Sequence, residues 1–276
     1  MGITELEDSN HCEADTRLIL EADKLDAPVI VHATDTDVLV LMVHEFPTQV
    51  FNQKWQMKIG HERFVNIESI CAKIGTEACA ILPAYHSITG CDTTSFPFGI
   101  GKLKPWKKMI KLKCYSLLNN FGSTLASIGF LSRSKEFFRT VMYGGNKDEC
   151  YIDTRIRMYE RQKVKSSSGI IPDENSTTQH LKRSCFQAYI WHQCTQQMID
   201  YPPLNKTWGW KEEEVGIVPV WYTCSQFPPN NNQLDTDSSD DEGAEVDDGR
   251  ESNEEESTDD SDYDLNDDSD GSEDDF

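Results

Sequence analysis

Acidic residues are concentrated at one end of this chain, and this separation decides which part of it can fold. The chain has 48 acidic and 26 basic residues. Residues 235–276 contain 22 of the acidic residues and one of the basic residues, so residues 1–234 contain 26 acidic and 25 basic residues. A segment with so many like charges and so few apolar side chains cannot bury enough surface to offset its ordering entropy. We therefore expect a disordered acidic tail over residues 231–276 and a nearly neutral folded part before it.

Other features of the sequence exclude some classes of protein. The first ten residues lack the basic and apolar regions of a secretory signal, so we do not expect secretion. The longest strongly apolar run, Val38 to Val43, is much shorter than the roughly 20 residues of a membrane-spanning helix, so we expect no membrane partner. The nine cysteines include no Cys-x2-Cys pair, which favours reduced, buried thiols over disulfides or structural zinc.

Helix and strand signals alternate over the first 90 residues, which predicts an α/β layer. Ala14, Leu18, Ala22 and Leu25 have helical spacing, and Asn10 with Glu13 is expected to cap that helix. The β-branched run from Val29 to Ala33 is typical of a buried parallel strand. Further expected elements are the apolar run 38–43, a strand near 49–51, and helices over 67–74 and 77–85.

The second half of the chain is predicted to be mainly helical. One helix is expected between Ser134 and Gly144-Gly145, followed by a polar linker over 165–178 and a helix over 179–198. The β-formers from Gly216 to Tyr222 indicate a strand or hairpin. The sequence therefore predicts four units. They are an α/β domain over residues 1–115, a helical region over 116–165, a linker with a helix and a short module over 166–230, and the tail over 231–276.

Three short acidic clusters lie in the α/β part, at residues 13–15, 35–37 and 90–92. Each has an ordinary alternative, since acidic residues also cap helices and form turns. Asp35 and Asp37 follow an expected strand, however, and ligands of open α/β sheets bind beyond the carboxyl ends of the strands. Clustered carboxylates are hard oxygen ligands that suit Mg²⁺ or Mn²⁺.

The order of four motifs resembles that of the flap endonuclease superfamily. The motifs are Glu13-Ala14-Asp15, Asp35-Thr36-Asp37, Gly90-Cys91-Asp92 and Gly99-Ile100-Gly101-Lys102. The resemblance covers residues 10–113 and corresponds to the C-terminal half of a PIN-like nuclease domain. The same motif order is similar to that of a group of uncharacterised animal proteins.

The resemblance implies a partial PIN-like parallel sheet with flanking helices and metal-dependent 5′ nuclease chemistry. Two Mg²⁺ or Mn²⁺ ions would activate a water and stabilise the leaving oxygen. The side chains that would line this site are Glu13, Asp15, Asp35, Asp37 and Asp92. The chain begins after the first, central strand of such domains, so we expect an exposed sheet edge and a truncated relative without assured activity.

A basic segment follows the last acidic cluster and resembles the turn with which these nucleases contact duplex DNA. Glycines let backbone amides approach phosphates, and lysines neutralise them. The expected nucleic-acid-binding residues are Gly99, Gly101, Lys102, Lys104, Lys107 and Lys108. The alternative is a solvated helix face. This resemblance predicts DNA rather than RNA as partner, and a nuclear rather than cytoplasmic location.

A second function of a different class fits the same residues. The chain would then be a noncatalytic nucleic-acid-binding or chromatin-binding protein on this scaffold, and its acidic tail would recruit histones or other basic proteins.

Overall fold

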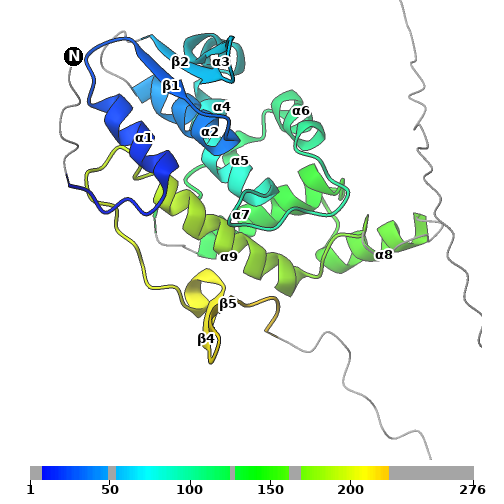
Figure 1. Cartoon of the computed structure of the whole chain (residues 1–276). Coiled ribbons are helices and arrows are strands. Elements are labelled where there is room, and N and C mark those ends of the chain that lie inside the picture. The colour runs from blue at the N-terminus through cyan, green and yellow to red at the C-terminus, as the bar shows by residue number, and fades with distance from the viewer. Residues whose placement is uncertain (1–7, 49–53, 125–127, 162–168, 224–276) are drawn as a thin grey trace, which may run out of the picture. The chain divides into compact units, whose positions relative to one another are not determined.

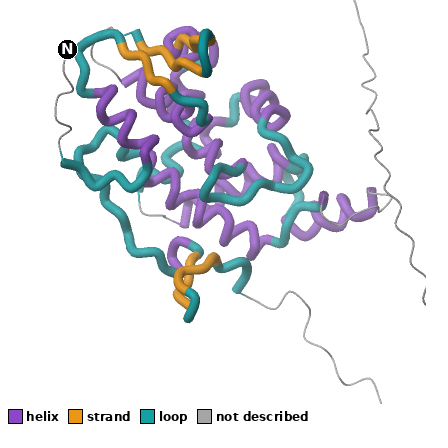
Figure 2. Tube along the Cα trace, viewed as in Figure 1, coloured by secondary structure: helices purple, strands orange, loops and turns teal. Residues whose placement is uncertain are grey.

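The computed structural model describes residues 8–48, 54–124, 128–161 and 169–223, with the side chains of 128–130 left out. The strand expected near residues 49–51 and the disordered tail expected over 231–276 lie outside these residues. Residues Met1–Pro229 group into one compact unit, which includes the boundaries expected at 115 and 165. Helices predominate, and the strands form two small groups (Figures 1 and 2).

The larger group is a mixed three-stranded sheet with the order β1-β2-β3. Its strands are β1 (Val29–His32), β2 (Trp55–Ile59) and β3 (Arg63–Asn66). The expectation of a parallel sheet is only partly met, since β1 pairs with β2 in parallel but β2 pairs with β3 in a hairpin. Gly60 turns this hairpin with a φ of 63°, which glycine adopts without steric cost.

Strand β1 lies at one edge of this sheet, and only one of its faces is covered. Val29 and Val31 are buried, whereas Ile30 is 58% exposed. The expectation of a fully buried strand is therefore wrong, because the helices that pack on the sheet cover the valine face alone.

Five helices accompany the sheet: α1 (Ala14–Asp23), α2 (Thr36–Glu45), α3 (Ile67–Ile74), α4 (Thr76–Ala80) and α5 (Leu82–Thr89). The apolar run Val38 to Val43 lies inside α2, where the Asp35 carboxylate caps the helix by accepting a hydrogen bond from the Asp37 amide at 2.9 Å. The single helix expected over 77–85 is divided between α4 and α5. A short 3-10 helix, η1 (Phe46–Thr48), follows α2.

Two expectations for α1 are wrong. Its buried side is formed by Thr16, Ile19, Leu20 and Ala22, while Leu18 and Leu25 are exposed. The helix has two stripes of apolar side chains with similar spacing, and tertiary packing buries only one of them. Neither Asn10 nor Glu13 caps the helix with its side chain, since Asn10 instead binds the backbone of Ile199 at 2.7 Å.

The remaining elements are helical except for one hairpin. They are α6 (Leu103–Leu112), η2 (Tyr115–Leu117), α7 (Ile128–Phe137), the π-helix η3 (Phe138–Met142), α8 (Tyr151–Arg161), α9 (Glu174–Trp191), η5 (Lys206–Trp208), and the strands β4 (Trp210–Glu213) and β5 (Gly216–Pro219). Ser134 lies inside α7 rather than at its start, and the helical segment ends just before Gly144, as expected. Helix α9 begins within the expected linker, where Asp173 caps it, and it ends at Trp191.

Helix α9 connects two hydrophobic cores. Leu181, Cys185 and Ala188 belong to the core that contains α5 and η3, whereas Trp191 belongs to the core that contains the sheet. Figure 1 shows α9 running beside α5 and α7, and contacts with both confirm this position. The backbone is close enough here that a Cβ on Gly122 would lie 2.5 Å from that of Ala188. The α/β part therefore shares its interior with the second half of the chain.

The described cysteines are all free, and four of them are buried: Cys79, Cys91, Cys185 and Cys194. Cys12 and Cys150 are exposed, so burial as small apolar groups does not hold for every cysteine. None of the described helices combines the length and the apolar composition required to cross a bilayer.

Candidate metal centre

Three carboxylates meet where helices α1 and α2 begin. Asp15 lies in the first turn of α1, Asp37 lies in the first turn of α2, and Asp35 precedes α2 as its cap. One oxygen from each of these side chains lies within 4.8 Å of the others. Helix N-termini favour negative charge, which offsets part of the repulsion between the three carboxylates. Asp15, Asp35 and Asp37 could therefore hold a metal ion.

The other two predicted acids, Glu13 and Asp92, affect the carboxyl group of Asp15. The pKa of Asp15 is raised to about 6, first by partial burial and then by the charges of four carboxylates. In order of decreasing effect these are Asp35, Asp37, Glu13 and Asp92. The other four expected acids therefore repel the ionised form of Asp15, and a divalent cation relieves repulsion of this kind.

Glu13 is held by side chains from helix α9 rather than by its own helix. Its carboxylate accepts hydrogen bonds from Gln187 Nε2 at 2.9 and 3.2 Å and from Trp191 Nε1 at 3.2 Å. The Gln187 side-chain carbonyl oxygen in turn accepts from the Thr93 hydroxyl at 2.8 Å. Gln187 and Trp191 thereby orient Glu13 and link it to the loop that carries Asp92.

Asp37 is held by a buried histidine. The His86 Nε2 atom lies 2.7 Å from Asp37 Oδ1, and because a carboxylate only accepts hydrogen bonds, Nε2 is the donor. The other ring nitrogen, Nδ1, lies 3.0 Å from the ammonium of Lys102, which donates to it. This chain of contacts fixes the orientation of Asp37, as partners of metal ligands commonly do.

Lys102 adds a positive charge to this site. Burial lowers the pKa of its ammonium, while Asp37, Cys91 and Asp92 act in the opposite direction. Its side chain is half-buried and turns back toward His86, whereas Lys104 and Lys107 are exposed. An ammonium beside the carboxylates can attract an anionic group into the metal centre.

Asp92 is exposed and lines, together with Glu13, a cavity of about 620 Å³. The cavity also reaches Arg183, Phe186, Tyr201 and Trp210. The cavity therefore offers aromatic surface beside two of the acids.

Of the other lysines in the expected basic segment, two are exposed to solvent and one packs against a neighbouring helix. Lys104 and Lys107 are exposed at the start of α6, where they line a cavity of about 420 Å³ with Gly101. Lys108 instead donates to the Thr140 carbonyl at 2.8 Å, so it helps to fix α6 against η3. Space is open around Gly99 and Gly101, and Gly99 has a φ of 68°.

The sequence contains no signal that marks His86, Gln187 or Trp191 as part of this site. His86 and Trp191 fall within apolar stretches that also suit a core, and Gln187 lies 174 positions from Glu13. Comparisons of this chain with family models, curated proteins and solved structures find no match.

Proposed function

We propose that this chain is a divalent-metal-dependent hydrolase of nucleic-acid phosphodiesters, related to the flap endonuclease superfamily. The observation that supports this most is the approach of the Asp15, Asp35 and Asp37 oxygens to within 4.8 Å of one another. Oxygen ligands in such a group suit Mg²⁺ or Mn²⁺. Lys102 beside them adds a positive charge for an anionic substrate.

Each side chain has a role that its position supports. Asp15, Asp35 and Asp37 would bind the metal directly, while Glu13 and Asp92 lie where they can bind water molecules around it. Bound Mg²⁺ or Mn²⁺ supplies an activated water and stabilises the leaving oxygen. Lys102 can transfer its hydrogen bond from His86 to a non-bridging phosphate oxygen, which positions the phosphodiester.

Cleavage of labelled DNA substrates in Mn²⁺ tests this proposal. The substrates are single-stranded, duplex and flapped DNA, and product is expected only with the metal. Asp35→Asn and Asp37→Asn are expected to reduce the rate at least about 100-fold, since each removes a charged ligand. Asp148→Asn, which changes an exposed acid far along the chain, is the control and should leave the rate unchanged.

Two results would contradict the proposal. One is cleavage that survives in the double variant Asp35→Asn/Asp37→Asn with its metal dependence intact. The other is a wild-type protein that binds DNA but cleaves none of the three substrates, which would favour the noncatalytic nucleic-acid-binding function instead.

The exposed lysines lead to a separate prediction about DNA affinity. Lys104→Gln/Lys107→Gln is expected to weaken duplex binding and to reduce the slope of log affinity against log salt by about 0.9 for each phosphate that is no longer neutralised. Deleting residues 235–276 is expected to strengthen binding, because 22 tethered carboxylates compete with phosphate for these lysines. Fluorescence anisotropy over a range of salt concentrations measures both effects.

The exposed Lys73 on α3 is the matched control, and Lys73→Gln should leave the affinity and the salt slope unchanged. Equal binding by the double lysine variant would show that the start of α6 is a solvated helix face.

A further inference from the structure

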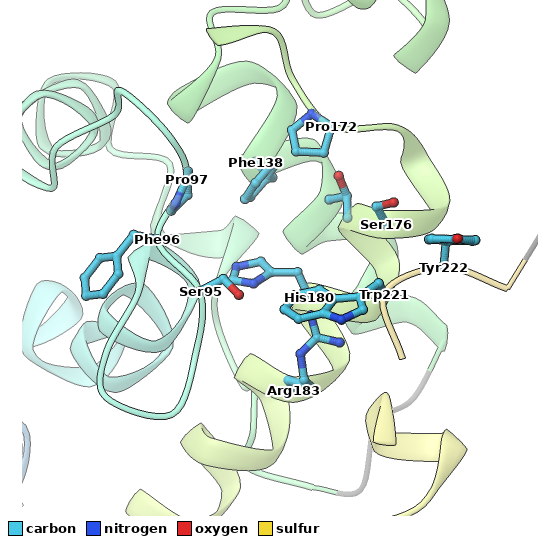
Figure 3. A pocket seen from close by; sticks show the side chains of 11 residues that line it. Ser95, Phe96, Pro97, Phe138, Pro172, Ser176, His180, Arg183, Trp221 and Tyr222 are labelled. Carbon is cyan, nitrogen blue, oxygen red and sulfur yellow. The ribbon is translucent and has the colours of Figure 1, made fainter. Parts of the chain in front are cut away.

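A second cavity lies beside the N-terminal half of α9, the helix that carries Gln187. It has a volume of about 430 Å³, and its walls come from the loop after Asp92, from η3, from the first turns of α9 and from the segment after β5. Figure 3 shows the side chains that line it, including the aromatic rings of Phe96, Phe138, Trp221 and Tyr222. Trp221 and Tyr222 are about half exposed, at 57% and 48%, so the cavity is open on that side.

His180 provides a hydrogen-bond acceptor in this cavity. Its Nε2 atom lies 2.9 Å from the Ile88 carbonyl, which can only accept, so Nε2 carries the proton and Nδ1 is an acceptor. Burial lowers the pKa of His180 to about 4, which keeps the ring neutral at physiological pH. His180 as a whole is only 8% exposed, and none of the residues that the structure describes bonds to Nδ1.

Arg183 provides a buried positive charge one helical turn further along. It is 5% exposed, and burial lowers the pKa of its guanidinium. Nη1 donates to the carbonyls of Val220 at 2.6 Å and Gly209 at 3.4 Å, and the guanidinium lies 5.1 Å from the centre of the Trp221 ring. Among the described carboxylates none pairs with it. A buried charge without a counterion is costly, so an anionic ligand would be strongly favoured here.

The wall that carries Trp221 and Tyr222 is fixed at both ends. Arg183 binds the Val220 carbonyl before them, and the Asn175 side chain binds the Thr223 amide and hydroxyl after them at 2.7 and 2.8 Å. Both anchoring side chains belong to α9. The aromatic wall is therefore held in place over His180 and Arg183 without a ligand, which reduces the entropy lost on binding.

We propose that this cavity binds a nucleotide, whose base stacks on Trp221 and donates an N–H to His180 Nδ1 while its phosphate lies toward Arg183. A planar ring with a donor and an attached anion fits these three features together. The choice of a nucleotide among aromatic anions rests on the proposed function. A free nucleotide and an unpaired nucleotide within a strand share this chemistry.

Calorimetry with the full chain in EDTA tests the proposal without involving the metal centre. The ligands are AMP, adenosine, which lacks the phosphate, and purine riboside monophosphate, which lacks the exocyclic amine. AMP is expected to bind, and each of the other two at least about tenfold more weakly, because each leaves a buried polar group without its partner. A single-stranded oligonucleotide that binds more tightly than AMP would assign the site to an unpaired nucleotide of a strand, and equal affinity would assign it to a free nucleotide.

Variants of the cavity distinguish this site from other surfaces. Trp221→Ala is expected to weaken AMP binding about tenfold or more because the base no longer stacks, and since Trp221 is largely exposed, the fold should persist. Arg183→Gln should weaken AMP more than adenosine, because both ligands lose this anchor of the Trp221 wall but only AMP loses a phosphate contact. Tyr159→Ala removes an aromatic residue that is equally exposed on α8 and serves as the control.

The proposal is overturned if the wild-type protein does not bind AMP, or if Trp221→Ala and a folded Arg183→Gln both bind it normally. Binding of an acidic peptide with no binding of any nucleotide would also overturn it. Asp35→Asn/Asp37→Asn should bind AMP like the wild type, so a failure of the proposed hydrolysis leaves this result unaffected and can be recognised separately.

Discussion

A chain that ends at residue 165 is expected to lose its cooperative unfolding transition. This truncation removes α9 and the segments on either side of it, and with them the large buried side chains Ile171, Leu181 and Trp208 from one core and Trp191 from the other. Replacing one large buried side chain with alanine costs about 2–5 kcal/mol, and the whole stability of a domain is about 5–15 kcal/mol. The loss of several such side chains therefore exceeds the stability available to the α/β part.

Thermal unfolding followed by circular dichroism and calorimetry measures this effect. A chain that ends at residue 229 is the control, and it should unfold cooperatively near the temperature of the full chain, since residues Met1–Pro229 form one compact unit. The single variant Trp191→Ala is expected to lower stability by about 3–5 kcal/mol. Cooperative unfolding of residues 1–165, or of residues 1–115, would show that the α/β part folds without α9.

Asp15→Asn is expected to have opposite effects on the metal-free and metal-bound protein. Without metal, the variant removes the carboxylate whose pKa is raised to about 6, first by partial burial and then by repulsion from its acidic neighbours. Partial exposure screens this repulsion, so the gain is about 1 kcal/mol, or a rise in Tm of about 2–4 °C. With Mn²⁺ at about 100 times its Kd, the wild type gains about 2.7 kcal/mol, and the variant should lose most of this gain.

The pH dependence of stability follows from the upward shift of the Asp15 pKa. The folded protein binds the Asp15 proton more tightly than the unfolded chain, whose carboxyl has the ordinary value of 3.8. The destabilisation from Asp15 is therefore absent below about pH 4, grows as pH rises toward 6, and is complete above that value. Metal affinity should rise over the same range, because only the ionised carboxylate binds the cation.

Differential scanning fluorimetry between about pH 4.5 and 8, with EDTA or Mn²⁺, measures both effects. Asp148→Asn again serves as the control, since this exposed acid lies outside the cluster. If Asp15→Asn lowers the Tm of the metal-free protein, or responds to Mn²⁺ like the wild type, Asp15 does not belong to a metal centre.

Local patterns in the sequence were sufficient for several elements. Helix α3 has the bounds that its apolar spacing predicts, and the strand signal at Val29 marks β1. These elements depend on side chains a few residues apart, so their signals are contained in a short stretch. The hairpin of β2 and β3 was missed, because polar residues interrupt both strands and Gly60 alone marks the turn.

The sequence by itself named the three carboxylates that meet in the structure, Asp15, Asp35 and Asp37, because each lies in a short acidic motif. Only the tertiary structure decided what surrounds them. Gln187 and Trp191 reach Glu13 across more than 170 residues, and the half-buried Lys102 turns back to His86. Such contacts arise because α9 packs against both cores, and packing between distant segments leaves no periodic signal in the sequence around any one of them.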